Sequence, residues 1–131
     1  MSVVDTWHEI LKTKNVSGLK DLLADDVVFY SPVVHTAQKG KPITTMYLSA
    51  AFHVFFNDTF SYVRETLDDD HAVLQFTTVI NGIEVNGVDM ITWNEQGQIT
   101  EFKVMVRPLK AINMIHEMMK KMLEGMSKGK V

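Results

Sequence analysis

The sequence predicts an α+β fold in which a curved antiparallel sheet wraps around N-terminal helices and encloses an internal pocket. In the first part of the chain, apolar residues recur at helical spacing. From Thr59 onward they alternate with a period of two, as they do in strands, and after Pro108 the helical spacing returns. Because a sheet with one apolar face must bury that face, we expect the helices to cover its concave side.

The N-terminal part is expected to contain helices and one short strand. Val3 and Trp7 fall on one helical face, and Val16-Ser17-Gly18 is typical of an elbow leading into a second, short helix. The segment Val27–Tyr30 has β-type composition, and Ser31-Pro32 is expected to end that strand because proline has no backbone N–H to donate.

A third helix is expected after Pro42, followed by a four-stranded meander. Asn81-Gly82 predicts a tight hairpin, since both residues tolerate positive φ, and Asn86-Gly87 predicts a bulge within the next strand. The expected strands cover residues 60–67, 71–80, 83–93 and 98–107.

Length and composition predict a single domain over residues 1–131, with residues 108–128 forming a C-terminal helix that caps the pocket or lies at a dimer interface. A net charge of −3 argues against a nucleic-acid partner. No signal peptide or apolar stretch of membrane-spanning length is apparent, so we expect a cytoplasmic protein that does not bind membranes. Without cysteine, disulfides and thiolate chemistry are excluded.

Three stretches carry a resemblance to a known superfamily: residues 22–32, the Gly40 that precedes the third helix, and residues 87–99. In this order and spacing the chain resembles the nuclear transport factor 2-like (NTF2-like) superfamily, which includes ketosteroid isomerases and SnoaL-type polyketide cyclases. The resemblance implies a cone-shaped α+β barrel. It also implies that Asp89 corresponds to a hydrogen-bonding aspartate of the isomerases, that Ser31 stands at the position of their catalytic base, and that Trp7 lies near the position of their tyrosine.

The candidate catalytic residues are Asp89, His35 and Tyr30. Asp89 alternates with apolar residues of its strand, so burial should raise its pKa and suit it to acid–base chemistry. A buried carboxylate that only holds sheet to helix is the alternative. His35, in the loop after the first strand, would shuttle protons or simply bond to backbone, and Tyr30 would donate a hydrogen bond or pack in the core.

The proposed ligand is a small apolar molecule bearing a carbonyl group, and the reaction is a proton transfer of the isomerase or cyclase type. A binding module without chemistry and a transport-factor-like interaction domain are the alternatives. No cofactor or metal is expected, because the acids and histidines are not clustered, and the resemblance together with the uncovered face of the sheet suggests a homodimer. The expected ligand-binding residues are Trp7, Tyr47, Phe52, Phe56, Phe76, Val85, Phe102 and Arg107.

Overall fold

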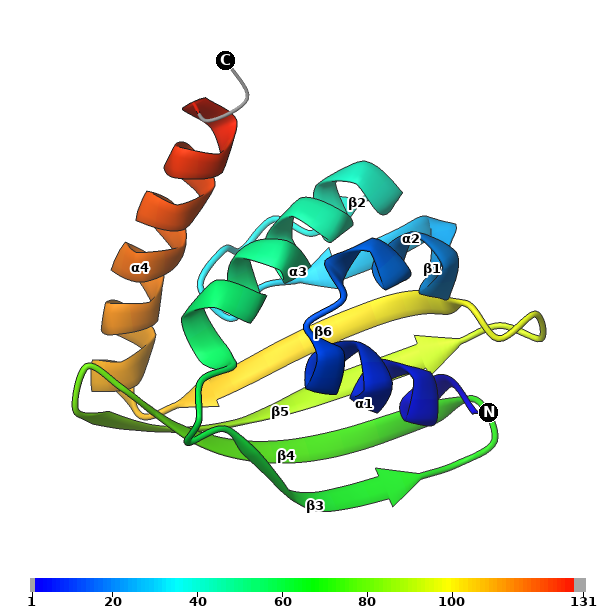
Figure 1. Cartoon of the computed structure of the whole chain (residues 1–131), viewed down its shortest axis with the longest axis horizontal. Helices are drawn as coiled ribbons and strands as arrows, with labels where there is room; N and C mark the ends of the chain where they lie inside the picture. The colour runs from blue at the N-terminus through cyan, green and yellow to red at the C-terminus, as the bar shows by residue number, and fades with distance from the viewer. Residues whose placement is uncertain (1, 129–131) are drawn as a thin grey trace.

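The protein is described by a computed structural model over residues 2–128, and a curved six-stranded sheet forms its centre (Figure 1). The strands lie in the order β2-β1-β6-β5-β4-β3. In chain order the elements are α1 (Val3–Thr13), the 3-10 helix η1 (Val16–Gly18), α2 (Leu19–Leu22), β1 (Leu23–Tyr30), β2 (Gln38–Lys39), α3 (Lys41–Phe55), β3 (Ser61–Leu67), β4 (His71–Ile80), β5 (Ile83–Trp93), β6 (Ile99–Arg107) and α4 (Leu109–Lys128).

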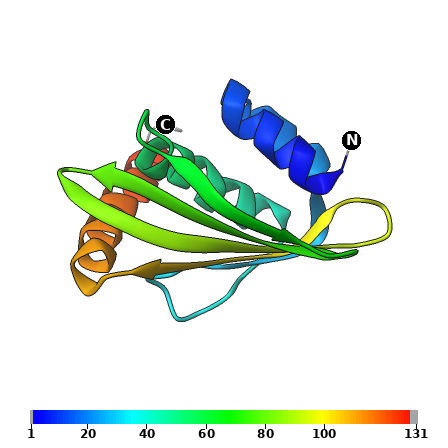
Figure 2. The same ribbon diagram turned by 90° about the horizontal axis from the view of Figure 1, so that it is seen from below.

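The predicted α+β fold is confirmed. Helices α1 and α3 lie on the same, concave side of the sheet, and no helix within residues 2–128 covers the opposite side (Figure 2). The sheet is curved but does not close, since β2 and β3 form its two edges. The fold is therefore an open cone whose concave side is filled by helices.

Helix α1 brings the first large aromatic residue to the sheet. A capping box begins it: the Ser2 hydroxyl accepts from the Asp5 backbone N–H at 3.1 Å, and the Asp5 carboxylate accepts from the Ser2 backbone N–H at 3.3 Å. The helix ends at Thr13, and Lys14, whose φ of 55° is left-handed, caps it. Within this helix Trp7 is only 1% exposed, so the amphipathic face predicted from the sequence is buried.

The meander β3–β6 follows the predicted strands closely. Asn81 and Gly82 have φ values of 51° and 75°, which confirms the predicted hairpin. The predicted bulge at Asn86-Gly87 is wrong, because β4 and β5 pair in unbroken register from His71–Thr92 to Ile80–Ile83. Glycine is needed at position 87 for another reason: a Cβ there would lie 2.6 Å from both the Phe76 ring and the Met105 carbonyl oxygen.

The N-terminal strand joins the sheet in parallel with the last strand. β1 begins at Leu23, earlier than predicted, and the register is irregular between Leu23 and Val28. Beyond this irregularity Phe29 pairs with Phe102 and Tyr30 with Lys103. Strand β2, which has two residues and was not predicted, pairs antiparallel with β1.

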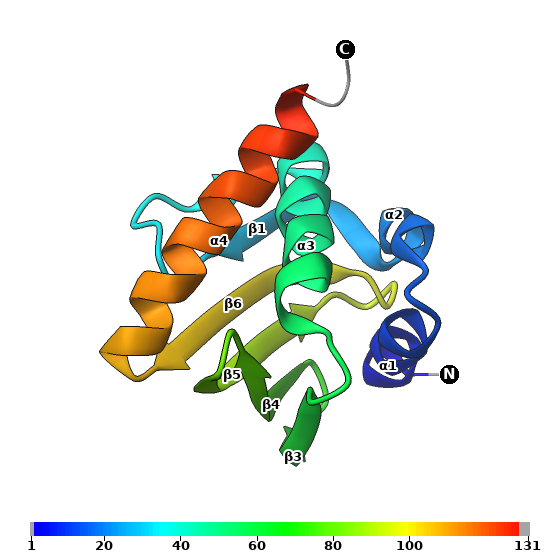
Figure 3. The same ribbon diagram turned by 60° about the vertical axis from the view of Figure 1, so that its left-hand side comes forward.

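The core has two parts on the concave side. One is built around Trp7, Phe29 and Phe102, and the other around Phe76 and Ile115. The C-terminal helix α4 runs alongside α3 and contributes Ile115 to the second part (Figure 3). The predicted C-terminal helix thus packs against the concave side of its own chain.

Candidate functional site

Asp89 lies in the interior, on the concave face of β5. It alternates with the buried residues Val85, Gly87 and Ile91 and is only 5% exposed. β5 is paired with β4 on one side and with β6 on the other, so its backbone is fixed along almost its whole length. The sequence pattern correctly predicted that this carboxyl group faces the apolar interior.

Burial is the main influence on the ionisation of Asp89. Loss of hydration disfavours the charged carboxylate and raises the pKa of Asp89 from 3.8 to about 7, while a hydrogen bond from Tyr62 acts in the opposite direction. Asp89 therefore changes its protonation state near neutral pH.

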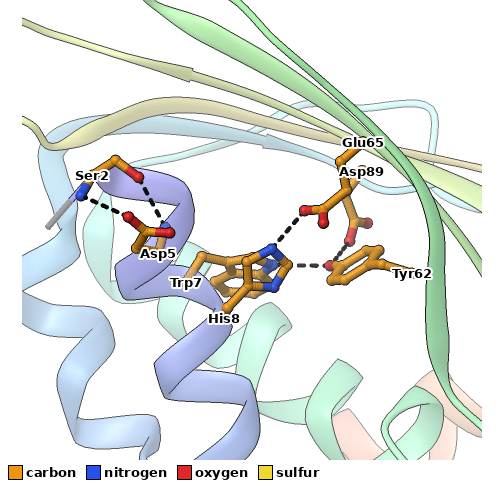
Figure 4. A network of polar contacts seen from close by, with 7 residues as sticks. All are labelled: Ser2, Asp5, Trp7, His8, Tyr62, Glu65 and Asp89. Carbon is orange, nitrogen blue, oxygen red and sulfur yellow. Dashed lines mark hydrogen bonds and ion pairs between the residues drawn. The ribbon is translucent and has the colours of Figure 1, made fainter.

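A chain of two hydrogen bonds holds this carboxyl group (Figure 4). The Trp7 indole N–H donates to the Tyr62 oxygen at 2.9 Å, and the Tyr62 hydroxyl donates to Asp89 Oδ2 at 2.5 Å. Burial, followed by the adjacent Asp89, raises the pKa of Tyr62 well above 10.0, so the phenol remains a donor. Because indole can only donate, Trp7 directs the single Tyr62 proton toward Asp89.

A contact between His8 and Glu65 at the protein surface flanks this chain of hydrogen bonds. His8 Nε2 lies 2.5 Å from Glu65 Oε1 and joins α1 to β3, and the His8 ring contacts the Tyr62 ring edge-on at a centroid distance of 5.4 Å (Figure 4). Both partners are about one third exposed. The pair therefore covers the outer side of Tyr62.

A small apolar cavity adjoins Asp89. Its volume is about 30 Å³, which is room for about two water molecules. Helix α4 contributes Ile115 and Met119 to its wall, and Asp89 and Ser31 are the polar side chains besides the indole of Trp7. The aromatic part of the wall consists of Trp7, Phe29, Phe55, Phe56, Phe60, Phe76 and Phe102.

A comparison with protein families matches residues 4–102 to the SnoaL-like domain. The chain belongs to the SnoaL-like domain family. The match includes Trp7 of α1, Ser31 after β1, and the strands that carry Tyr62 and Asp89. A comparison with curated proteins finds no match.

Solved structures resemble this SnoaL-like domain over nearly its whole length. A steroid delta-isomerase from Pseudomonas aeruginosa is 34% identical, with a TM-score of 0.89 over 96% of this chain and 92% of that one. An uncharacterized protein with a cystatin-like fold from Silicibacter pomeroyi DSS-3 is 28% identical, with a TM-score of 0.84 over 91% and 83% of the two chains. A de novo designed protein with a curved β-sheet, 17% identical with a TM-score of 0.69 over 89% and 98%, shares the fold alone.

Several residues predicted from the sequence meet at the cavity of the SnoaL-like domain. Asp89 lines the cavity together with Trp7, Phe56, Phe76 and Phe102. Phe52, Tyr47 and Val85 lie in the surrounding core and do not line it.

Three predicted site residues lie away from the cavity, which corrects the sequence-based expectation for them. Tyr30 points to the opposite face of β1 from Phe29, where the Lys103 ammonium lies 4.9 Å from its ring centroid. His35 is exposed in the loop after β1, and Arg107 is exposed at the end of β6. Alternation along β1 and β6 turns Tyr30 and Arg107 outward, and we leave all three out of the proposed site.

Tyr62 is a polar residue of the candidate site that the sequence analysis did not select. The register of β3 against β4 shifts between Tyr62 and Arg64. If every second residue is assigned to one face, counting back from the apolar C-terminal end of β3, Tyr62 is therefore placed on the wrong face of the sheet. Its partner Asp89 is 27 residues away in the chain. A tyrosine preceding an irregularity in an edge strand is a weak signal that only the folded chain makes clear.

Replacing Tyr62 by phenylalanine is expected to raise the pKa of Asp89 further and to destabilise the SnoaL-like domain by about 1–3 kcal/mol. The variant removes the only hydrogen bond recorded for Asp89 among residues 2–128 and leaves the Trp7 indole N–H without an acceptor. NMR titration of the Asp89 carboxyl carbon and urea unfolding would measure the two effects. Tyr30→Phe is the matched control and should change neither, and an unaltered titration in Tyr62→Phe would contradict the assigned contact.

Two kinds of feature are not found in the part of the chain that the structure describes. No group of three or more His, Cys, Asp or Glu side chains within residues 2–128 is arranged to hold a metal ion. No helix in the same range is long and apolar enough to cross a membrane.

Proposed function

We propose that this SnoaL-like domain binds a small apolar molecule bearing a carbonyl group next to Asp89 and transfers a proton on it. One observation carries the proposal: a carboxyl group only 5% exposed lines an apolar cavity and has a pKa of about 7. A general acid–base group is most effective when its pKa lies near the working pH. Asp89 meets this requirement without a cofactor.

The neighbouring groups support an acid–base role for Asp89. The Tyr62 hydroxyl donates a hydrogen bond to Oδ2 of Asp89, whereas no residue between 2 and 128 donates one to Oδ1 of Asp89. The free oxygen can accept a proton from a bound molecule while the other stays hydrogen-bonded. Tyr62 stabilises the carboxylate that must be present when the proton is taken.

Ligand binding requires the cavity to widen, because about 30 Å³ does not hold an organic molecule. Met119 of α4 is the most adaptable part of the wall, since a thioether side chain has three rotatable bonds and fills irregular space. We propose that a ligand enters by displacing Met119 and the adjoining part of α4.

The comparisons support a reaction of the isomerase class. The Pseudomonas aeruginosa protein with 34% identity is a steroid delta-isomerase, and a 14% identical structure from Kribbella flavida, a putative ketosteroid isomerase, shares the fold. An isomerisation of this kind moves a proton between two carbon atoms. One carboxyl group that first accepts and then returns the proton is sufficient for such a step.

Hydrogen–deuterium exchange tests the proposed proton transfer without knowledge of the natural substrate. Ketones with apolar skeletons, such as 2-tetralone, would be incubated with the protein in D₂O, and loss of their α-hydrogen NMR signals would be followed. We expect catalysed exchange that rises with pD through the titration of Asp89 and disappears in Asp89→Asn. Exchange that persists in Asp89→Asn would contradict the role of Asp89.

A binding module without chemistry is the second candidate, and the same experiment separates it from an enzyme. Its supporting observation is that Asp89 already has a partner in Tyr62, as a purely structural carboxyl group would. Binding of 2-tetralone by both the wild type and Asp89→Asn, without catalysed exchange by either, would favour this candidate.

We also propose that the uncovered face of the sheet binds a second copy of the chain. Val73, Val88 and Met105 lie on this face, and Met105 is 49% exposed. Lys103 and Glu101 on the same face supply both signs of charge, which suits a two-fold interface that pairs one patch with itself.

Sedimentation should give a dimer for the wild type and a folded monomer for Met105→Asp. A monomeric wild type at about 50 µM would contradict the proposal.

A further inference from the structure

Ser31 is a second polar group at the cavity, and its hydroxyl proton is available. The residue follows the end of β1 and lines the cavity together with Pro32 and Val33. Its Oγ accepts a hydrogen bond from the Val33 backbone N–H at 3.2 Å. A serine hydroxyl has one donor and two acceptor sites, so this contact leaves its O–H free to donate to a molecule in the cavity.

The strand register aligns Ser31 with Asp89 across the concave face. Tyr30 and Lys103 form the last pair of the parallel β1–β6 ladder, Ser31 and Val104 are the residues that directly follow this pair, and Val104 pairs with Asp89 in the β5–β6 ladder. Val104 also lines the cavity. Two strand spacings of about 4.8 Å separate the Cα atoms of Ser31 and Asp89 by roughly 10 Å. Molecules of a few carbon atoms can bridge such a gap.

The two groups have complementary chemistry. Ser31 offers a proton to an acceptor, whereas the carboxylate of Asp89 offers a free oxygen to an acidic hydrogen. The cavity wall around them is apolar, since Val104, Phe29 and Phe102 line it. A molecule that fits has one hydrogen-bond acceptor, an acidic C–H close to it, and an otherwise apolar skeleton.

We propose that Ser31 binds the carbonyl oxygen of the substrate, and that the substrate is an apolar ketone whose α-carbon faces Asp89. This inference rests on the proton transfer proposed above. Asp89 takes the α-hydrogen as a proton, the C–H electron pair forms the carbon–carbon double bond of an enolate, and the carbonyl π pair moves onto oxygen. The Ser31 hydroxyl donates a hydrogen bond to that oxygen, and Asp89 then returns the proton to carbon.

Two compounds that share a carbon skeleton test the role of Ser31. 2-Tetralone contains the carbonyl group and tetralin lacks it. We expect Ser31→Ala to weaken 2-tetralone binding by about 3–10-fold, the value of one neutral hydrogen bond, and to leave tetralin binding unchanged. Exchange of the 2-tetralone α-hydrogens should slow by about 100-fold, because the hydrogen bond strengthens as charge develops on oxygen. Ser31→Thr, which keeps a hydroxyl, should restore most of both effects.

The outcomes separate this inference from the proposal beneath it. Equal losses of 2-tetralone and tetralin binding in Ser31→Ala would show that Ser31 only supports the Val33 turn, and unaltered exchange would exclude it as a donor. Either result overturns the role of Ser31 while Asp89-dependent exchange stands. Absence of exchange in the wild type, or exchange that survives Asp89→Asn, overturns the proton transfer itself. Failure of the wild type to bind either compound at millimolar concentration would contradict both.

Discussion

The Asp89→Asn variant is expected to gain stability relative to the wild type as the pH rises from about 4 to about 8, by about 4 kcal/mol in total. The pKa of Asp89 is about 7 in the folded protein and near 3.8 when the chain is unfolded. Between these values the unfolded state has lost the proton and the folded state has kept it, so folding becomes less favourable as the pH rises. Below about 3.8 the full stability is present, and above about 7 the loss is complete.

Comparing the two proteins isolates this effect, because the titrations of all other carboxyl groups cancel in the difference. Urea unfolding of wild type and Asp89→Asn at each pH gives the two free energies of unfolding. A difference of about 4 kcal/mol is large beside the roughly 5–15 kcal/mol that stabilise a domain. A difference that is constant with pH would mean that Asp89 titrates normally, and the proposed acid–base role would fall with it.

Replacing Gly87 by alanine is expected to destabilise the protein by about 3 kcal/mol. The added Cβ would lie 2.6 Å from the Phe76 ring and 2.6 Å from the Met105 carbonyl oxygen. The second atom belongs to the backbone of the paired strand β6 and cannot move away without distorting the sheet. Thermal unfolding should show a midpoint lower by about 10 °C.

The same substitution at Gly125 is the matched control. Gly125 lies in α4, and a Cβ there would meet no atom within 4 Å. Alanine should stabilise the helix by about 0.5–1 kcal/mol because it loses less backbone entropy on folding than glycine. Since Phe76 lines the cavity, Gly87→Ala should also weaken 2-tetralone binding, whereas Gly125→Ala should not. Equal stability of the two variants would contradict the described contact.

The sequence was sufficient to predict most elements of the fold because its apolar periodicity is regular. The strands β4 and β5 begin and end where alternation and the Asn81-Gly82 turn predict. The errors in the predicted fold arose where the local sequence pattern suggests one structure and pairing with the neighbouring strands produces another. Asn86-Gly87 is typical of a bulge, yet the glycine there accommodates the ring of Phe76, which comes from the neighbouring strand and cannot be inferred from the local sequence.

The candidate site was only partly predictable for a similar reason. Asp89 was identified because an acid that alternates with the apolar residues of its strand is conspicuous in the sequence. Tyr62 was missed and Tyr30 was favoured, because the direction of each depends on strand register: an irregularity beside Tyr62 turns it inward, and regular alternation turns Tyr30 outward. Alternation reveals that a strand has two faces, but pairing with its neighbours decides which residues share a site.

The cavity wall has two parts that are held in different ways. Asp89 and Phe76 belong to strands whose backbones are fixed by hydrogen bonds to neighbouring strands, whereas Ile115 and Met119 belong to a helix that side-chain packing holds against the sheet. Substitutions on the helix can therefore reshape the space above Asp89 without moving its carboxyl group. In evolution or in engineering, new ligands of the proposed site would be accommodated by changing α4, while the strands keep Asp89 in place.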